Sequence, residues 1–305
     1  MRALVAGGTK FVGRHLVELL LADGHDVTLF NRGRTNPELF PEAARISGER
    51  ADPPAELGRR DWDWVFDVSG YTADDVSRLG GLVAGRAGRY VFVSTGSVYR
   101  DRAGNPGVAE DGELWPTTAE FTAEGSPSAY GARKAAAEAA LRGLATPWTV
   151  VRPVLIYGPW DLTDRCHYWL HRVRAGTVVV PEPPVGVNHS VYVTDLARIL
   201  VGAAKAPHAA GRIYNGASTV HHTLADWIAA ASRVSGVTPE VNTVPWAELG
   251  GPLPMVGPGG ERSVSSERIQ RELGFTSTPF EQTLAESYAH MDAEGRPIRE
   301  WIPIS

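Results

Sequence analysis

A tyrosine and a lysine stand four residues apart in AYGARKAAAEAALRG, residues 129–143 of a chain of 305 residues. The alanine-rich stretch favours a helix, and positions i and i+4 share one helix face, so Tyr130 and Lys134 are expected to be neighbours. An ammonium beside a phenol favours the phenolate and lowers a pKa that is about 10 when unperturbed. Such a tyrosine can accept or donate a proton at neutral pH, as oxidation of an alcohol or reduction of a ketone requires.

Two hydroxyl-bearing residues stand at the end of a second expected element, a strand in VFVSTGSVY (91–99). The apolar run predicts a buried strand, and Ser94 and Thr95 stand at its carboxyl end. In an open parallel sheet this end faces the ligand crevice. A hydroxyl there can hold a substrate oxygen in line with the tyrosine.

A glycine-rich turn joins the first expected strand to the first expected helix, in VAGGTKFVGRH (5–15). Its glycines stand where a dinucleotide-binding fold needs a tight turn, close approach of pyrophosphate and close helix–strand packing. The helix start would present free amides and a positive dipole end to the phosphates. Glycines also end strands for structural reasons alone, but the strand–turn–helix context favours cofactor binding. The expected cofactor contacts are Gly7, Thr9, Lys10, Phe11, Val12 and Gly13.

The tip of the second expected strand, LFNRGRT (29–35), bears on the choice of cofactor. A fold that selects NAD usually places Asp or Glu here to bind the ribose hydroxyls, whereas this chain has Asn31, followed by Arg32 and Arg34. A neutral amide beside guanidinium groups can bind a 2′-phosphate that an acid would repel. We expect NADP to be favoured, with NAD as the alternative. The other interpretation is that both arginines are solvated turn residues.

The elements that must position these residues alternate along the first half of the chain. Strands are expected over 3–7, 25–30, 64–70, 89–95 and 148–158, and helices over 11–24, about 74–85 and about 128–144. This order predicts an α/β fold with a Rossmann-type, doubly wound parallel sheet.

The sequence changes character after Gly158, where prolines, tryptophans and histidines become common. Helices are expected at about 194–205 and 223–235, joined by GRIYNGAS (211–218), with Thr223 and Asp226 as a capping box for the second. Residues 247–262 are expected to form a loop. We assign 1–157 to a nucleotide-binding domain, to which 188–205 returns, and 158–305 mainly to a smaller substrate-binding lobe.

Taken together, GGTKFVG, VSTGSVY, Tyr-x-x-x-Lys and RPVLIYGP (152–159) resemble the extended short-chain dehydrogenase/reductase superfamily, in particular its NAD(P)-dependent epimerase/dehydratase group. The motifs follow the family's order over about residues 1–160. VYVTDLA (191–197) and ERIQRELGF (267–275) resemble the group's C-terminal half more weakly.

The resemblance implies a role for individual residues. Tyr130 would be the general acid/base, Lys134 would hold the nicotinamide ribose, and Thr95, four residues before Tyr99, would be the hydroxyl partner. Further contacts with the cofactor are implied for Val68, Ser69, Gly70, Pro153 and Val154.

Two departures from the family pattern narrow the chemistry. Sugar-nucleotide dehydratases of this group commonly have Asp-Glu after the active-site threonine, whereas this chain has Gly96 and Ser97, which argues against dehydration. Many sugar-nucleotide enzymes also have a diphosphate-binding arginine where this chain reads Asn188 and His189. A diphosphate-linked substrate is therefore not favoured.

The segment GPWDLTDRCHYWLHR (158–172) predicts an aromatic, partly cationic wall that would suit a ring-bearing substrate. The alternative is that Tyr168 and Trp169 belong to the core of the small lobe. Cys166 is expected to be a small buried hydrophobe, and the His221–His222 pair predicts no metal site. The expected substrate contacts are Ser97, Tyr157, Trp160, Arg165, His167, Tyr168, Trp169 and His189.

Composition limits the partners. A net charge of −5 and a pI near 6.0 give no basic footprint for nucleic acid, and no stretch reaches the roughly 20 apolar residues of a membrane span. The single cysteine fits a reducing cytoplasm. We expect a cytoplasmic protein with a small-molecule substrate and neither nucleic-acid nor membrane partner, and the resemblance allows a homodimer.

The leading hypothesis is an NADP-preferring oxidoreductase that moves a hydride between nicotinamide and a carbinol or carbonyl carbon. An NAD-dependent sugar or sugar-nucleotide epimerase with tightly bound cofactor is the alternative. A third hypothesis, from another class, is a non-catalytic family member that senses the nucleotide or binds RNA.

Overall fold

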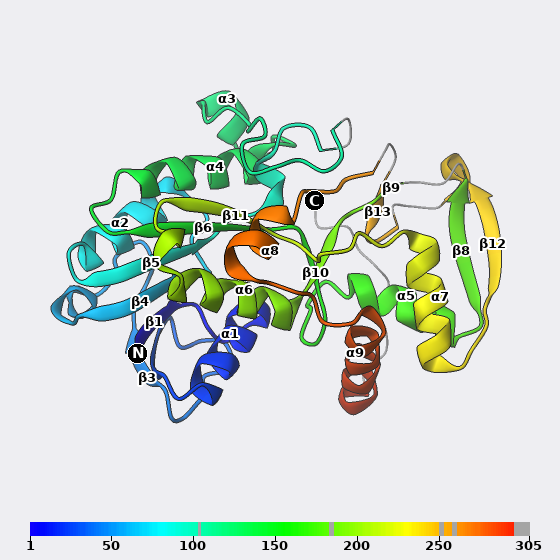
Figure 1. Ribbon diagram of the computed structural model, residues 1–305, viewed down its shortest axis with the longest axis horizontal. Helices are drawn as coiled ribbons and strands as arrows, with labels where there is room; N and C mark the ends of the chain where they lie inside the picture. The colour runs from blue at the N-terminus through cyan, green and yellow to red at the C-terminus, as the bar shows by residue number, and fades with distance from the viewer. Residues whose placement is uncertain (103–104, 183–185, 250–252, 258–260, 296–305) are drawn as a thin grey trace.

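The computed structural model describes residues 1–102, 105–182, 186–249, 253–257 and 261–295. A parallel sheet of seven strands, in the order β11-β6-β5-β4-β1-β2-β3, forms its larger part (Figure 1). The strands are β1 (Arg2–Ala6), β2 (Asp26–Asn31), β3 (Ala44–Ser47), β4 (Trp62–Asp67), β5 (Ala87–Val93), β6 (Trp148–Pro153) and β11 (Arg212–Gly216). The predicted Rossmann-type fold is confirmed.

Helices cover both faces of the sheet. On one face α1 (Phe11–Ala22) packs against α6 (Val193–Lys205), and on the other α2 (Ala73–Val83) packs against α4 (Ala129–Arg142). Side chains alternate between the faces of a strand, so Val5 joins the core beneath α1 and α6, whereas Leu4 joins the core beneath α2 and α4. Burial on both faces explains why the strands are apolar almost throughout.

Two strand assignments needed correction. The expected strand 148–158 is broken, because β6 ends at Pro153, which has no N–H, and β7 (Leu155–Tyr157) leaves the sheet to pair with β10 (Ser190–Tyr192). The segment GRIYNGAS contains β11, the seventh strand, which pairs with β6. The other strands and the helices predicted for the first half are confirmed, with small shifts at their ends.

The small lobe has its own hydrophobic core, built on Trp169, Trp227 and Leu284 from three helices. Short strand pairs flank it, β8 (Thr177–Glu182) with β12 (Glu240–Pro245) and β9 (Gly186–Val187) with β13 (Val256–Gly257). Figure 1 shows these elements beside the carboxyl ends of the sheet strands. The remaining helices are α3 (Ala119–Thr122), α5 (Arg165–Arg174), α7 (Leu224–Ser235), α8 (Glu267–Leu273) and α9 (Phe280–Glu294).

Helix α7 begins with the predicted capping box. Thr223 Oγ1 accepts a hydrogen bond from Asp226 N at 3.1 Å, and Asp226 Oδ2 accepts one from Thr223 N at 2.8 Å. The expected loop 247–262 is partly wrong, since it contains β13, and residues 250–252 and 258–260 of it lie outside the described residues.

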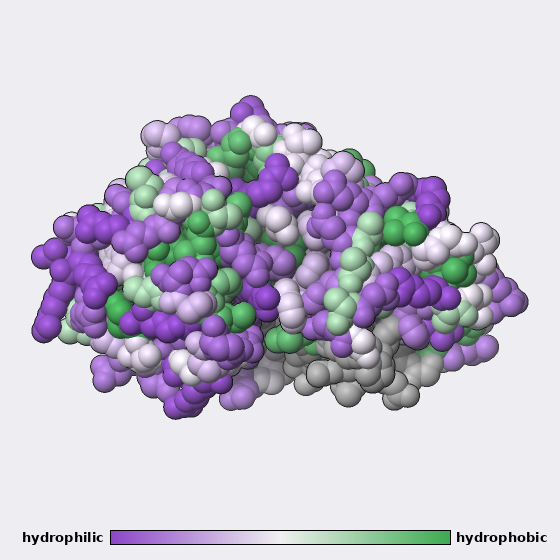
Figure 2. Space-filling model, turned by 90° about the horizontal axis from the view of Figure 1, so that it is seen from below, coloured by the Kyte–Doolittle hydropathy of each residue, from purple (hydrophilic) through white to green (hydrophobic). Residues whose placement is uncertain are grey.

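The surface seen from below is mainly hydrophilic, with hydrophobic side chains in separate small patches (Figure 2). Within the described part of the chain, no helix is both long and apolar enough to span a membrane.

Candidate active site

A pocket of about 1210 Å³ opens at the carboxyl ends of the central strands. The ends of two strands line it, with Val68 and Gly70 after β4 and Thr95 and Ser97 after β5. Helix α4 contributes Tyr130 and Lys134 to the lining. On the side of the small lobe, the pocket is lined by residues just before α5 and by its first residue: Asp161, Leu162, Thr163 and Arg165. The pocket therefore lies where parallel sheets of this kind bind ligands.

Lys134 is held firmly although it is buried, with only 4% of its surface exposed. Its Nζ donates to the carbonyl oxygens of Gly70 at 2.7 Å and Val93 at 2.6 Å, and it lies 4.2 Å from the centre of the Phe92 ring. Burial lowers the pKa of the ammonium to about 8, although the carboxylates of Asp67 and Glu138 oppose this shift. The lysine thus ties α4 to the ends of β4 and β5.

Tyr130 lies at the pocket surface, with 49% of it exposed and its ring 6.4 Å from that of Tyr71. The surrounding walls raise the pKa of the phenol by desolvation, and a hydrogen bond with Thr95 and the charge of Arg165 oppose this. The expectation that Lys134 lowers the pKa of Tyr130 is therefore wrong for this structure. The ammonium faces two backbone carbonyls instead of the phenol.

Thr95 and its neighbours place a second hydroxyl at the same wall. Thr95 is buried and caps a short 3₁₀ turn at Gly96–Val98, where its Oγ1 accepts from Ser97 N at 3.1 Å. Ser94, by contrast, donates its Oγ hydrogen to Glu138 Oε1 at 2.6 Å and is directed away into the core. Of the two candidate hydroxyls, only Thr95 lies near enough to Tyr130 to lower the pKa of its phenol.

A buried ion pair lies directly behind this wall. Arg152 binds both oxygens of Glu138, at 2.9 and 2.7 Å, and each side chain is 1% exposed. Arg152 Nη1 also donates to Tyr99 Oη at 3.0 Å and to the carbonyl of Glu110 at 2.9 Å. These contacts join α4, β6 and the segment after Thr95, so they fix the strand ends that carry the candidate catalytic groups. Arg152 was part of a quoted motif, but no sequence pattern identified Glu138 as its partner.

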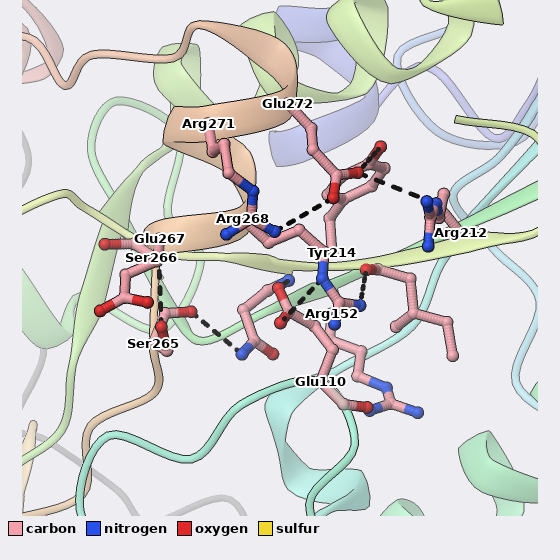
Figure 3. Close-up of polar contacts among 12 residues, drawn as sticks. Glu110, Arg152, Arg212, Tyr214, Ser265, Ser266, Glu267, Arg268, Arg271 and Glu272 are labelled. Carbon is pink, nitrogen blue, oxygen red and sulfur yellow. Dashed lines mark hydrogen bonds and ion pairs between the residues drawn. The ribbon is translucent and has the colours of Figure 1, made fainter. Parts of the chain in front are cut away.

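The polar contacts continue from this pair toward α8 (Figure 3). Glu110 accepts from Asn215 N at 3.0 Å and lies 3.4 Å from Arg268 Nε. Glu272 accepts from Tyr214 Oη at 3.0 Å on the far side of β11. The seventh strand is thereby anchored to the segment that follows Thr95.

The glycine turn has the geometry that a dinucleotide requires. Gly7 has a φ of +114°, and a Cβ there would lie 2.6 Å from Val68 Cγ2. A Cβ on Gly13 would lie 2.7 Å from Gly8 N, so the helix can approach the turn only without a side chain. Lys10 is exposed and makes no capping bond, and Phe11 and Val12, at the start of α1, line the pocket.

Asn31, at the tip of β2, holds the turn in place. Its Nδ2 donates to the carbonyl of Gly7 at 3.0 Å, and its Oδ1 accepts from Gly33 N at 2.8 Å. Asn36 donates in the same way to the carbonyl of Thr9, at 2.9 Å. Asn36 was missed because its contact spans 27 residues of sequence.

The two arginines after β2, Arg32 and Arg34, differ in their contacts. Arg34 forms an ion pair with Glu49, which lies just after β3, at 3.0 Å, and both side chains are exposed. Arg32 is exposed at the same tip. Ser69 donates to the carbonyl of Ala6 at 3.0 Å, which joins β4 to β1 beneath the turn.

The remaining residues expected at the cofactor lie at the pocket. Pro153 and Val154, where β6 ends, line it together with Val68 and Gly70. These residues follow β6 and β4, which are far apart in sequence and lie on either side of β5 in the sheet.

Only part of the expected substrate wall lies at the pocket. Ser97 and Arg165 line it, as expected. Trp160, Tyr157, His167, Tyr168, Trp169 and His189 do not belong to its lining. The predicted aromatic wall does not line this pocket, and the burial of Trp169 agrees with the alternative that it belongs to the core of the small lobe.

The reason is burial in the small lobe. Tyr157 bonds Thr283 Oγ1 at 2.8 Å, and Trp169 Nε1 donates to the carbonyl of Pro254 at 2.9 Å. Tyr168 is half-buried and packs edge-on against Trp169. Burial lowers the pKa of His189 to about 4, and its ring nitrogens lie against the carbonyls of Val264 and Ser218.

The pocket contains polar residues that sequence reasoning did not find. Asp161 lies on its small-lobe side, and Arg102 and Arg133 add positive charge. Asp161 and Arg165 stand in the same quoted segment, so their spacing was visible. What was missing was the direction of each side chain, which depends on the backbone conformation of that segment.

Comparison with known proteins identifies a family profile and two relatives that match much of the sequence. The sequence profile described as the NAD dependent epimerase/dehydratase family matches residues 3–74 and 75–217. A 2-alkyl-3-oxoalkanoate reductase of Stenotrophomonas maltophilia (strain K279a) is 31% identical over 239 residues, covering 70% of this chain and 69% of the reductase. A chloroplast stem-loop binding protein of 41 kDa of Arabidopsis thaliana is 26% identical over 260 residues, covering 80% of this chain. The matched region spans 65% of that relative's length.

Solved structures share the fold at low sequence identity. The UDP-glucuronic acid 4-epimerase of Bacillus cereus, in complex with UDP-glucuronic acid and NAD, has a TM-score of 0.74 at 17% identity over 96% of this chain and 100% of that one. The UDP-glucose 4-epimerase of Thermotoga maritima, with UDP-glucose, has a TM-score of 0.74 at 18% identity over 97% and 100%.

Proposed function

Because the chain belongs to the NAD dependent epimerase/dehydratase family, we propose that it is an NADP-preferring oxidoreductase. It moves a hydride between nicotinamide and a carbinol or carbonyl carbon of a small metabolite. The observation that carries this proposal is that Thr95, Tyr130 and the buried Lys134 line the same pocket.

Thr95 and Tyr130 would hold the substrate oxygen between them. Since the pKa of Tyr130 is raised, the phenol is protonated at neutral pH and is ready to give its proton to that oxygen. This protonation state favours reduction of a carbonyl over oxidation of an alcohol. The 31% identity to a reductase supports the same direction.

Lys134 would orient the cofactor. An ammonium has three hydrogens, and two of them are donated to the carbonyls of Gly70 and Val93. The third is left for a ribose hydroxyl, the role that the family resemblance implies. Held this way, the lysine positions the nicotinamide beside Tyr130 without needing to shift the phenol's pKa.

The residues of the glycine turn fit a dinucleotide. Gly7 and Gly13 leave no room for a Cβ, so the backbone can approach pyrophosphate, and the first turn of α1 carries no acidic side chain. The bound nicotinamide would supply the hydride. The chain's own contribution is to bind the dinucleotide, fix the substrate oxygen and deliver the proton.

NADP is favoured at the tip of β2. Asn31 places a neutral amide where an acid would repel a 2′-phosphate, and Arg32 is exposed beside it. Arg34 would have to exchange Glu49 for the phosphate, and an exposed ion pair of this kind is weak, worth roughly 0–1 kcal/mol.

Cofactor titration tests the proposal. Purified protein is checked by absorbance and mass spectrometry for retained nucleotide and is then titrated with NADPH and NADH. We expect exchangeable cofactor, tighter binding of NADPH, and loss of that preference in Arg32→Gln but not in the remote control Arg60→Gln. Tightly retained NAD would contradict the proposal and favour an epimerase. Selective retention of RNA at physiological salt, with no nucleotide bound, would favour the non-catalytic alternative.

A further inference from the structure

The segment between β7 and α5 has an unusual backbone. Gly158, Trp160 and Asp164 have φ values of +129°, +64° and +53° within seven residues. Positive φ is uncommon outside glycine, and it persists only where surrounding structure imposes it. Such backbone conformations are concentrated at ligand-binding sites. The contacts that hold this segment in its conformation therefore bear on whether it contributes to a ligand site.

Two helices clamp the segment. From α1, His15 Nε2 bonds the carbonyl of Pro159 at 3.1 Å, and the guanidinium of Arg14 lies 3.8 Å from the centre of the Trp160 ring. From α9, His290 Nε2 accepts from Trp160 N at 3.1 Å, with the two rings 4.4 Å apart. Trp160 therefore serves as an anchor on the outer side of the segment.

The clamp places Asp161 at the pocket with one oxygen unused. Asp161 is 2% exposed, and its Oδ1 accepts from Thr163 N at 2.9 Å and from Thr163 Oγ1 at 2.6 Å. Its Oδ2 is buried and has no hydrogen-bond partner among the described residues. Buried carboxylate oxygens are normally bonded, so an unpaired one in a pocket wall points to a donor brought by a ligand.

The charges around the pocket indicate what kind of donor this is. Arg102, Arg133, Lys134 and Arg165 line the pocket, and Asp161 is the only acidic residue in the part of its lining that the structure describes. An ammonium group would be repelled by this excess of positive charge, whereas a neutral hydroxyl would not. The donor that fits Asp161 Oδ2 is therefore an uncharged group, such as a hydroxyl.

We propose that Asp161 is a specificity-determining residue that accepts a hydrogen bond from a substrate hydroxyl near the reacting carbon. The preferred substrate is then a hydroxylated ketone, or the corresponding polyol in the reverse direction, and not a plain ketone. This inference rests on the proposed oxidoreductase function, because it describes the substrate bound at the same pocket.

Matched ketone pairs test the inference. With NADPH, kcat/KM is measured for 2-hydroxycyclohexanone against cyclohexanone and for dihydroxyacetone against acetone. Wild-type protein should prefer the hydroxylated member by about tenfold or more, the size expected for a hydrogen bond to a charged group. Asp161→Asn keeps the shape and an acceptor for Thr163 but replaces the charged acceptor with a neutral amide, whose hydrogen bond with a hydroxyl is weaker. It should reduce the preference mainly through a higher KM for the hydroxylated ketones.

Two further variants separate the effect from misfolding. Asp23→Asn, an acid-to-amide change at an exposed site on α1 remote from the pocket, should leave the preference intact. Asp161→Glu retains the charge and should keep more of the preference than Asp161→Asn. Equal use of both ketones by wild type, or an unchanged preference in folded Asp161→Asn, would overturn the inference alone. No turnover of any of the four ketones, with NADPH bound, would remove the proposed function as well.

Discussion

Lys134 illustrates what a single residue does in this site. Its ammonium is buried, donates to two carbonyls and has a pKa of about 8, below its ordinary 10.5. The folded protein therefore binds this proton less tightly than the unfolded chain does. Raising the pH through this window removes a buried charge from the folded state and relieves its desolvation.

The stability of the wild type should reflect that shift. Between pH 8 and about 10 the unfolded chain holds more protons at Lys134, so the free energy of unfolding should rise relative to that of Lys134→Met, by at most about 1.4 kcal/mol per pH unit. Urea denaturation of both proteins at several pH values measures this difference. Lys205→Met, a lysine-to-methionine change at an exposed site, is the matched control for the substitution itself. A constant difference between wild type and Lys134→Met would contradict the burial argument.

Residue types were easier to predict than residue environments. Tyr130, Lys134 and Thr95 were found from spacing, because i and i+4 geometry and strand ends are local properties. The direction of the Tyr130 pKa shift could not be predicted from the spacing. It depends on the pocket walls and on which acceptors bind Lys134 Nζ. The unpaired Oδ2 of Asp161 depends on contacts with α1 and α9, which are distant in sequence.

At the scale of elements, α1 packs directly against the glycine turn. A Cβ on Gly13 would meet the backbone of Gly8 at 2.7 Å, and backbone cannot move aside as a side chain can. Gly202, inside α6, has nothing within 4 Å of the same position. The two glycines therefore make a matched pair of helix substitutions.

Gly13→Ala should displace α1 from the turn. We expect a loss of about 1–3 kcal/mol in stability, as overpacking typically causes, and weaker NADPH binding. Gly202→Ala should be neutral or stabilising by up to about 1 kcal/mol, since alanine favours the helix and meets no neighbour. Thermal unfolding and NADPH titration compare them, and equal behaviour of the two variants would contradict the packing argument.

The buried ion pair between Glu138 and Arg152 joins helix α4 to strand β6. Glu138→Gln leaves Arg152 buried without a carboxylate, so we expect a loss of about 3–5 kcal/mol in stability. The exposed pair of Arg233 and Glu281 is the control, and Glu281→Gln should lose less than about 1 kcal/mol. Denaturant titration measures both. A small loss in Glu138→Gln would show that the pair does not hold the two elements together.

The molecule as a whole combines a predictable half with a less predictable one. Alternating strands and helices indicated the sheet, because each strand is an apolar run buried on both faces. Strand β11 was missed because its place is set by pairing with β6, more than 60 positions earlier in the chain. The small-lobe aromatics could not be assigned to core or pocket from the sequence, because a core tryptophan and a pocket tryptophan have the same sequence signature.

The whole-molecule arrangement places the phenol of Tyr130 at the meeting point of sheet, α4 and small lobe. Thr95 from the sheet and Arg165 from the lobe line the same pocket as Tyr130, and both oppose the rise in the pKa of its phenol. Reduction should thus depend on the phenol itself more than on any single cofactor contact.

The most direct measurement is ketone reduction by wild type and Tyr130→Phe, followed by NADPH oxidation, together with NADPH affinity for both. Removing the hydroxyl should lower kcat by about 10²–10⁴-fold, the usual size of a general-acid contribution, and leave NADPH binding unchanged. Retained activity in Tyr130→Phe would contradict the assignment of Tyr130 as the proton donor, and with it the proposed mechanism.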